Sequence, residues 1–81
     1  MAKAIGRFIV VDPNVCHGQP TFRGTRILVA DVLDQVAKGM AWEAIMENWR
    51  GSLSHEAIAE PVRVAREIMM NHQEELVPAL K

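Results

Sequence analysis

The sequence has few of the features that would assign a small protein to a specialised class. Its single cysteine, Cys16, excludes an intrachain disulfide and fits a reducing cytosol. No apolar run is long enough to span a membrane, and the start "MAKAIGRFIVV" has too short an apolar run for a signal peptide. A net charge of -1 gives no global positive field that would attract nucleic acid. We therefore expect a cytoplasmic protein whose contacts with any nucleic acid are local.

Aliphatic surface, by contrast, is abundant. Hydrophobic residues make up 49% of the 81 residues, although the aromatic residues are only two Trp and two Phe. A chain of this length buries a modest fraction of its surface by itself. No repeat, low-complexity stretch or linker divides the chain, so we expect a single domain over residues 1–81. We also expect a homo-oligomer, a dimer or higher, because another subunit would cover the remaining apolar surface.

Extended structure is predicted near the start of the chain, in a β-element spanning residues 7–29. The run "FIVV" at residues 8–11 is apolar on both faces and is followed by "DPN", which favours a turn. Thr21 and Phe22 lead through "RGT" into "RILV", which indicates a hairpin with Gly24 at the positive φ of a primed turn. The sequence therefore predicts a strand followed by a β-hairpin.

Beyond the β-element, apolar residues recur at three- and four-residue steps, which predicts a helical bundle over residues 30–72. The first helix starts near Val29 and is ended by Gly39. The second covers residues 42–49. The third begins after Ser54, whose hydroxyl is a suitable N-cap, and reaches about Met70.

Pro61 is the irregular feature of the third helix. A proline at this position removes the hydrogen bond to the carbonyl of Ala57. We therefore expect a kink there, or two helical segments that meet near Glu60.

The segment "VCHGQPTFRGTR" at residues 15–26 concentrates chemically active side chains. A metal site usually needs three or four ligands, and the histidines other than His17 lie far along the chain. Neighbours in an extended segment point to opposite sides, so Cys16 and His17 are not expected to form a nucleophilic pair. The preferred interpretation is a pair of turns permitted by Gly18 and Gly24, with no catalytic residue, metal or cofactor. Arg23 and Arg26 would then face each other, which is unfavourable unless an anion, such as a carboxylate, lies between them.

The longer stretch "VDPNVCHGQPTFRGTRILVADVLDQVAKGM" closely resembles the opening of the bacterial and archaeal domain of unknown function family 433. The resemblance covers residues 9–69. It implies a mainly α fold, in which a small N-terminal β-element precedes a three-helix, homeodomain-like helix-turn-helix bundle. The chain departs from the family pattern at Leu28, at Ala41-Trp42 and at Pro61. The signature residues that carry the resemblance are Cys16, His17, Gly18, Pro20, Arg23, Gly24, Thr25 and Arg26.

Family members resemble VapB-type antitoxins, whose usual partner is a PIN-like ribonuclease toxin. By this resemblance the second and third helices would form the helix-turn-helix, and the start of the third helix would enter a major groove. The candidate DNA contacts are Arg50, Ser54, His55, Arg63 and Arg66. The exposed stripe of the third helix, however, reads Glu56, Glu60, Arg63 and Glu67, which suits a solvated, salt-bridged face at least as well.

The opposite side of the third helix is apolar and wider than one neighbouring helix needs, so we expect a partner to cover part of it. The tail, residues 73–81, mixes glutamates with apolar side chains, and Pro78 argues against a long helical continuation. A tail of this kind can bind a partner or can simply be a frayed end. Its candidate partner-binding residues are Leu76, Val77 and Leu80.

These observations favour a non-enzymatic, antitoxin-like protein that binds and neutralises a PIN-like ribonuclease toxin and contacts operator DNA. The alternative is an oligomeric protein-interaction module without DNA binding, which the near-neutral charge and the excess apolar surface favour.

Overall fold

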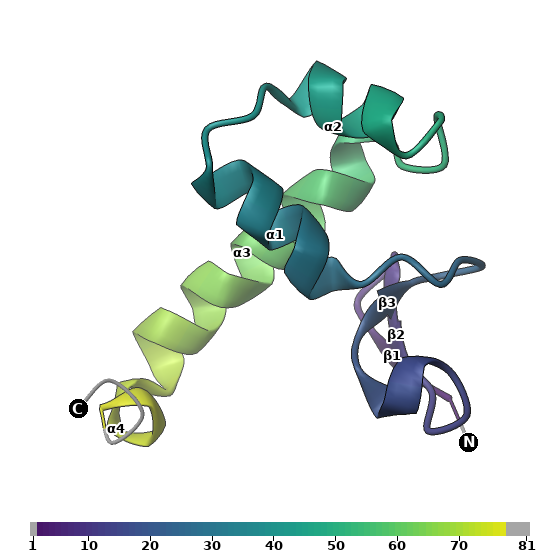
Figure 1. Ribbon diagram of the computed structural model, residues 1–81. Coiled ribbons are helices and arrows are strands. Elements are labelled where there is room, and N and C mark those ends of the chain that lie inside the picture. Colours follow the sequence, from purple (N-terminus) through teal and green to yellow (C-terminus); the bar gives the residue numbers. More distant parts are fainter. Residues whose placement is uncertain (1, 78–81) are drawn as a thin grey trace.

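The computed structural model describes residues 2–77, which form a small antiparallel sheet followed by helices (Figure 1). The sheet has the strand order β1 (Lys3–Ile5), β2 (Ile9–Val11), β3 (Thr21–Phe22), and a one-turn 3-10 segment, η1 (Cys16–Gly18), lies between β2 and β3. The helices are α1 (Val29–Ala37), α2 (Trp42–Asn48), α3 (His55–Asn71) and the short α4 (Gln73–Leu76). The predicted fold class, a small N-terminal β-element followed by three helices, is confirmed.

The sheet differs in detail from the prediction. Strand β1 was not expected; it pairs with β2 through Ile5 opposite Ile9 and Lys3 opposite Val11. Conversely, the second strand of the expected hairpin is reduced to one bridge between Thr21 and Leu28, because the chain enters α1 at Val29. Strand β2 is thus the central strand, and its two neighbours cover both of its edges.

The predicted helices and their ends agree with the structure to within one or two residues. Gly39 adopts a positive φ of 82° directly after α1, as expected of a residue that ends a helix. Ser54 is the N-cap of α3, where its Oγ accepts a hydrogen bond of 3.1 Å from the amide of Ala57. Local sequence therefore determines where these helices begin and end.

Helix α3 runs without interruption from His55 to Asn71, so the prediction of two segments meeting near Glu60 is wrong. Pro61 lies inside the helix and is buried. Burial of its ring offsets the one hydrogen bond that Ala57 loses, and the turns on either side remain helical.

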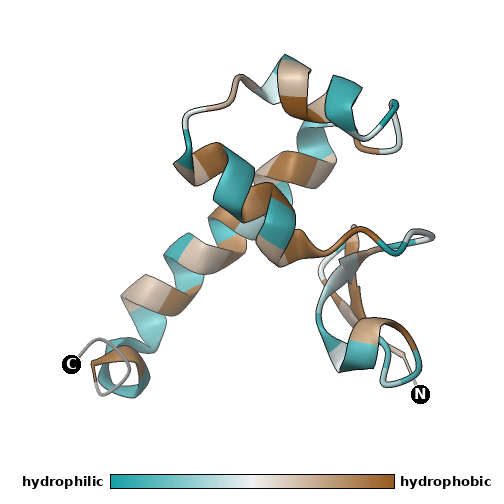
Figure 2. Ribbon diagram, in the orientation of Figure 1, coloured by the Kyte–Doolittle hydropathy of each residue, from teal (hydrophilic) through white to brown (hydrophobic). Residues whose placement is uncertain are grey.

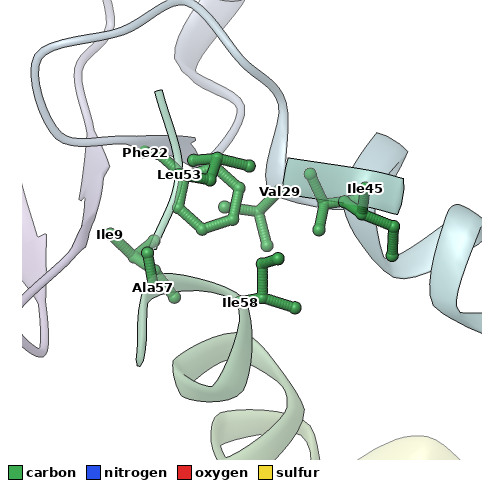
Figure 3. Packing of buried hydrophobic residues seen from close by; sticks show 8 residues of the cluster. Ile9, Phe22, Val29, Ile45, Leu53, Ala57 and Ile58 are labelled. Carbon is green, nitrogen blue, oxygen red and sulfur yellow. The ribbon is translucent and has the colours of Figure 1, made fainter. Parts of the chain in front are cut away.

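The core lies where the sheet, α1, α2 and the first half of α3 meet (Figure 3). Phe22, Val32, Ile45 and Ile58 are fully enclosed there, one from each of these elements. Beyond Pro61 no described residue of α3 is fully buried, although the half-buried Val64 still packs against the core. The rest of α3 extends past α1 towards α4 with polar and apolar residues interspersed along it (Figure 2).

Candidate binding surfaces

The first surface is formed by the signature residues, which fold into two tight turns. In η1 three consecutive residues, Cys16, His17 and Gly18, have positive φ values of 49°, 57° and 79°. The expectation that Cys16 and His17 lie in an extended segment is therefore wrong: the segment is a left-handed turn. Non-glycine residues in this region cost about 1 kcal/mol each, and such strain persists only where surrounding contacts enforce it.

The contacts that hold η1 are hydrogen bonds within and between the two turns. The amide of Gly18 donates to the carbonyl of Val15 at 3.0 Å. The Cys16 thiol donates to the carbonyl of Arg26, with Sγ 3.6 Å from the oxygen. Cys16 thus links the left-handed turn to the second turn of the signature.

The second turn contains Gly24 and is fixed by Thr25. The Thr25 hydroxyl donates to the carbonyl of Phe22 at 2.8 Å and accepts from the amide of Ile27 at 3.0 Å. Gly24 has the predicted positive φ, 76°. The turn is not of the primed type, because Arg23, its first central residue, has no positive φ. Nothing lies within 4 Å of a Cβ built on Gly24, so backbone conformation alone requires the glycine.

The Glu60 carboxylate on α3 accepts two hydrogen bonds from the turn between β1 and β2, and this pair of hydrogen bonds is here called the clasp. Glu60 Oε2 accepts from the amide of Arg7 at 2.8 Å, and Oε1 accepts from the amide of Phe8 at 2.7 Å. A Cβ on Gly6 would lie 2.8 Å from Glu60 Cδ, so only glycine admits the carboxylate here. The expectation that Glu60 belongs to a freely exposed stripe is wrong, because it is half-buried and joins the sheet to α3.

The clasp also determines the charge state of Glu60. Partial burial raises the pKa of this carboxyl, but the amide hydrogen bonds from Phe8, Arg7 and Ile9, together with the charge of Arg23, outweigh it. The pKa is therefore lower than its ordinary value of 4.5. Arg23 lies beside the same turn, where its Nε donates to the carbonyl of Arg7 at 3.0 Å. Sequence reasoning missed this site because its halves are 52 and 53 residues apart.

Positive charge is concentrated in the N-terminal part of the chain, residues 1–28, and not on α3, the helix expected to enter a major groove. Residues 1–28 carry four cationic side chains against the single carboxylate of Asp12, a net charge of +3; the total of -1 leaves -4 for residues 29–81. Among residues 2–77, no carboxylate lies within ion-pair distance of Arg7, Arg23 or Arg26. A separate charge count for the two segments would have found this asymmetry.

The five candidate DNA contacts do not form one cluster. Arg50, Ser54 and His55 lie at the turn between α2 and α3, where the His55 ring packs against Trp42 with ring centroids 4.6 Å apart. Arg66 lies eleven residues beyond His55, about 16 Å further along the helix axis, and its Nη1 is 3.6 Å from Glu67 Oε1. With Glu60 engaged elsewhere, the exposed stripe still carries Glu56 and Glu67 against the two arginines Arg63 and Arg66.

The second surface is the part of the chain that leaves the core, residues 62–77, here called the arm. Met69 and Met70 are 63% and 59% exposed, and Ile68 is 41% exposed. Of the predicted tail contacts, Leu76 is half-buried and Val77 is exposed, whereas Leu80 lies outside the described residues. The arm therefore presents apolar side chains that the rest of the described chain does not cover.

Beside the arm lies an open, wholly apolar groove of about 200 Å³. Ile5 and Ile9 of the sheet form one wall and Leu33 of α1 contributes to another. The third wall belongs to α3, from Pro61 through Val64 and Ala65 to Ile68. The groove thus continues the hydrophobic core outwards along the base of the arm.

Within residues 2–77 no three His, Cys, Asp or Glu side chains are grouped so that they could hold a metal ion. None of the described helices is long and apolar enough to cross a bilayer.

Neither the curated proteins nor the solved structures gave a match to this chain. A family model does match residues 9–62, which include both signature turns, the clasp residue Glu60 and the core, and the chain therefore belongs to the family described as Protein of unknown function (DUF433).

Proposed function

We propose that this protein is a non-enzymatic antitoxin-like protein that binds and neutralises a PIN-like ribonuclease toxin through its arm. The observation that carries the proposal is the exposure of apolar side chains on the second half of α3, which extends beyond the buried residues of the core. An amphipathic helix of this kind suits a hydrophobic groove on a partner protein. The resemblance of the family to VapB-type antitoxins supplies the class of partner.

The outer side of the arm and the tail are the proposed toxin-binding residues. Successive residues of an α-helix are rotated by about 100° around its axis. Met70 therefore lies on the side of α3 opposite to Pro61 and Ile68, which line the groove. Methionine side chains adapt to irregular partner surfaces. Val77, beyond the end of α3, is also exposed and follows the half-buried Leu76.

Operator DNA is proposed as a weaker ligand of the toxin–antitoxin pair. The mixed charges of the α3 stripe repel phosphates about as much as they attract them. Arg7, Arg23 and Arg26 at the turns of the sheet lack carboxylate partners within residues 2–77 and add positive charge that the helix does not provide. Gel shifts should therefore weaken for Arg26→Ala as well as for the double variant Arg63→Ala, Arg66→Ala.

Co-expression tests the toxin proposal directly. The reading frame beside the gene is expressed alone and then together with the full chain, and growth and ribonuclease activity are measured. We expect growth arrest that the native chain relieves. The double variant Met70→Asp, Val77→Asp should fail to relieve it, whereas Lys38→Asp at the C-cap of α1, with the same change in net charge, should relieve it.

Rescue by the Met70 and Val77 variant at the native level would refute the arm as the toxin-binding surface. If the neighbouring product is neither a ribonuclease nor a ligand of this chain, the antitoxin proposal fails. The second candidate is an oligomeric interaction module without DNA binding, which the large accessible surface of the chain, 5956 Å², favours.

A further inference from the structure

The chain exposes more surface than a monomer of its size should. Its accessible surface is 5956 Å². A folded monomer of 9.1 kDa is expected to expose about 4,900 Å². The excess of about 1,000 Å² exceeds the roughly 800 Å² that each partner buries in a stable interface.

The dimensions of the chain agree with this excess. The radius of gyration is 13.2 Å, whereas a compact domain of this length should have about 11.7 Å. The extra extent has a visible source, because the arm leaves the core and runs past α1 (Figure 1). The chain is therefore more extended than a compact domain of its length, and the arm accounts for the difference.

From these observations we propose that the groove beside α3 is occupied by the arm of a second copy of this chain. The two α3 helices would pack antiparallel about a two-fold axis close to Ala65. Each copy would place the base of its arm in the groove of the other. This proposal goes beyond toxin binding and does not depend on it.

The lining of the groove favours a second copy over an unrelated protein. The α3 residues that form one wall of the groove, from Pro61 to Ile68, span the start of the arm. In a two-fold dimer the same surface patch of each copy packs against itself. These α3 residues can meet this requirement, because in each copy they line the groove and also fill the groove of the other copy. A foreign partner would impose no such requirement.

The position of the axis follows from the order of these residues. Pro61 and Ile68 lie at the two ends of the α3 wall, and Val64 and Ala65 lie at its middle. In an antiparallel pair, Ile68 of one copy would pack over Pro61 and Ile5 of the other. Ala65 has the smallest side chain of the α3 wall, and this lets the helix axes approach to about 8–10 Å.

The oligomeric state of the full-length chain tests the proposal, without toxin present. Light scattering at micromolar concentration should give twice the 9.1 kDa chain mass. Ala65→Glu should shift the protein to monomer, since two facing carboxylates should weaken dimerisation by about a hundredfold or more. Ala65 is exposed in the single chain, so circular dichroism should show an unchanged fold. Met70→Glu, on the outer side of the same helix, should remain dimeric.

Cysteine cross-linking tests the antiparallel arrangement. In a Cys16→Ser background, Ala65→Cys should form an intermolecular disulfide on mild oxidation, because facing residues lie within disulfide range. Met69→Cys should not, because its two copies would be displaced by about 12 Å along the helix axes. A monomeric native chain, a dimer that survives Ala65→Glu, or efficient cross-linking through Met69 would each overturn the proposal. None of these results affects the toxin test, which uses the outer side of the arm.

Discussion

The two halves of α3 belong to one unbroken helix and yet have opposite environments. In residues 55–61 the helix is capped by Ser54, buried through Ile58 and joined to the sheet by Glu60. In residues 62–71 no side chain is fully buried; Val64 alone packs against the edge of the core, and the ion pair and hydrogen bond there involve near neighbours such as Glu67 and Asn71. The contrast teaches that helix formation and tertiary anchoring are separate properties of this segment, and that the free half is available for partners.

The sharpest test of this contrast truncates one apolar side chain in each half. Ile58→Ala removes a fully enclosed side chain and should lower the free energy of unfolding by about 3 kcal/mol, from lost burial and a residual cavity. Met70→Ala, on the free half, should change it by less than about 0.5 kcal/mol. Denaturant unfolding of the two variants gives both numbers. Equal losses would mean that the second half is anchored as firmly as the first.

Glutamates provide a matched pair for the clasp. Glu60→Gln should destabilise the fold by about 1–2 kcal/mol, because the amide hydrogen bonds to Arg7 and Phe8 lose their charged acceptor. Glu67→Gln, one exposed carboxylate further along the helix, should have an effect within about 0.5 kcal/mol. Thermal unfolding at neutral pH compares them. A larger loss at Glu67 would contradict the division of the helix into anchored and free halves.

The cap at the start of the anchored half should have an intermediate effect. Ser54→Ala removes the acceptor for the amide of Ala57 and should cost about 1 kcal/mol. Ser54→Asp retains a cap acceptor and should recover most of that stability. Urea unfolding of both variants makes the comparison, and a fully stable Ser54→Ala protein would show that tertiary contacts alone fix the start of α3.

The smallest expected effect is a dependence on pH. The pKa of Glu60 is lower in the folded chain than its ordinary value of 4.5, so the clasp contributes its full stabilisation above that pH. The contribution should be lost as the pH falls through the folded pKa, when the carboxyl becomes protonated in both states. The stability difference between the native chain and Glu60→Gln should therefore shrink below pH 4.5. A difference that grows on acidification would contradict the lowered pKa.

Much of the fold could be predicted from local signals. The three- and four-residue spacing of apolar side chains located all three main helices, and Ser54, Gly39 and Gly24 were identified as the residues of a cap, a helix end and a turn. The signature residues also carried the resemblance to the family that the family model confirms. Strand β1 was missed because "KAI" is too short and too mixed in polarity to give a pattern.

The surfaces were harder to predict than the elements. Helical spacing alone places Glu60 on an exposed stripe beside Glu56 and Arg63. Its true partners are amides on a turn more than fifty residues earlier in the chain. Cys16 and His17 were expected to be extended, since nothing in the local sequence other than Gly18 favours a left-handed turn. The hydrogen bond from Cys16 to Arg26 that helps to hold this turn joins two separate loops.

By itself, the sequence determined the three main helices, the Ser54 cap of α3 and the apolar side of each of these helices, because these depend on residues within one or two turns of each other; the short α4 was not predicted. Only the tertiary structure decided which part of an apolar helix side is covered. Full burial ends at Pro61 because the sheet, α1 and α2 meet the first half of α3; in the second half only Val64 reaches the core, and the described elements leave most other side chains exposed. Spacing along the chain shows that a surface is apolar, but coverage depends on where distant segments finally pack.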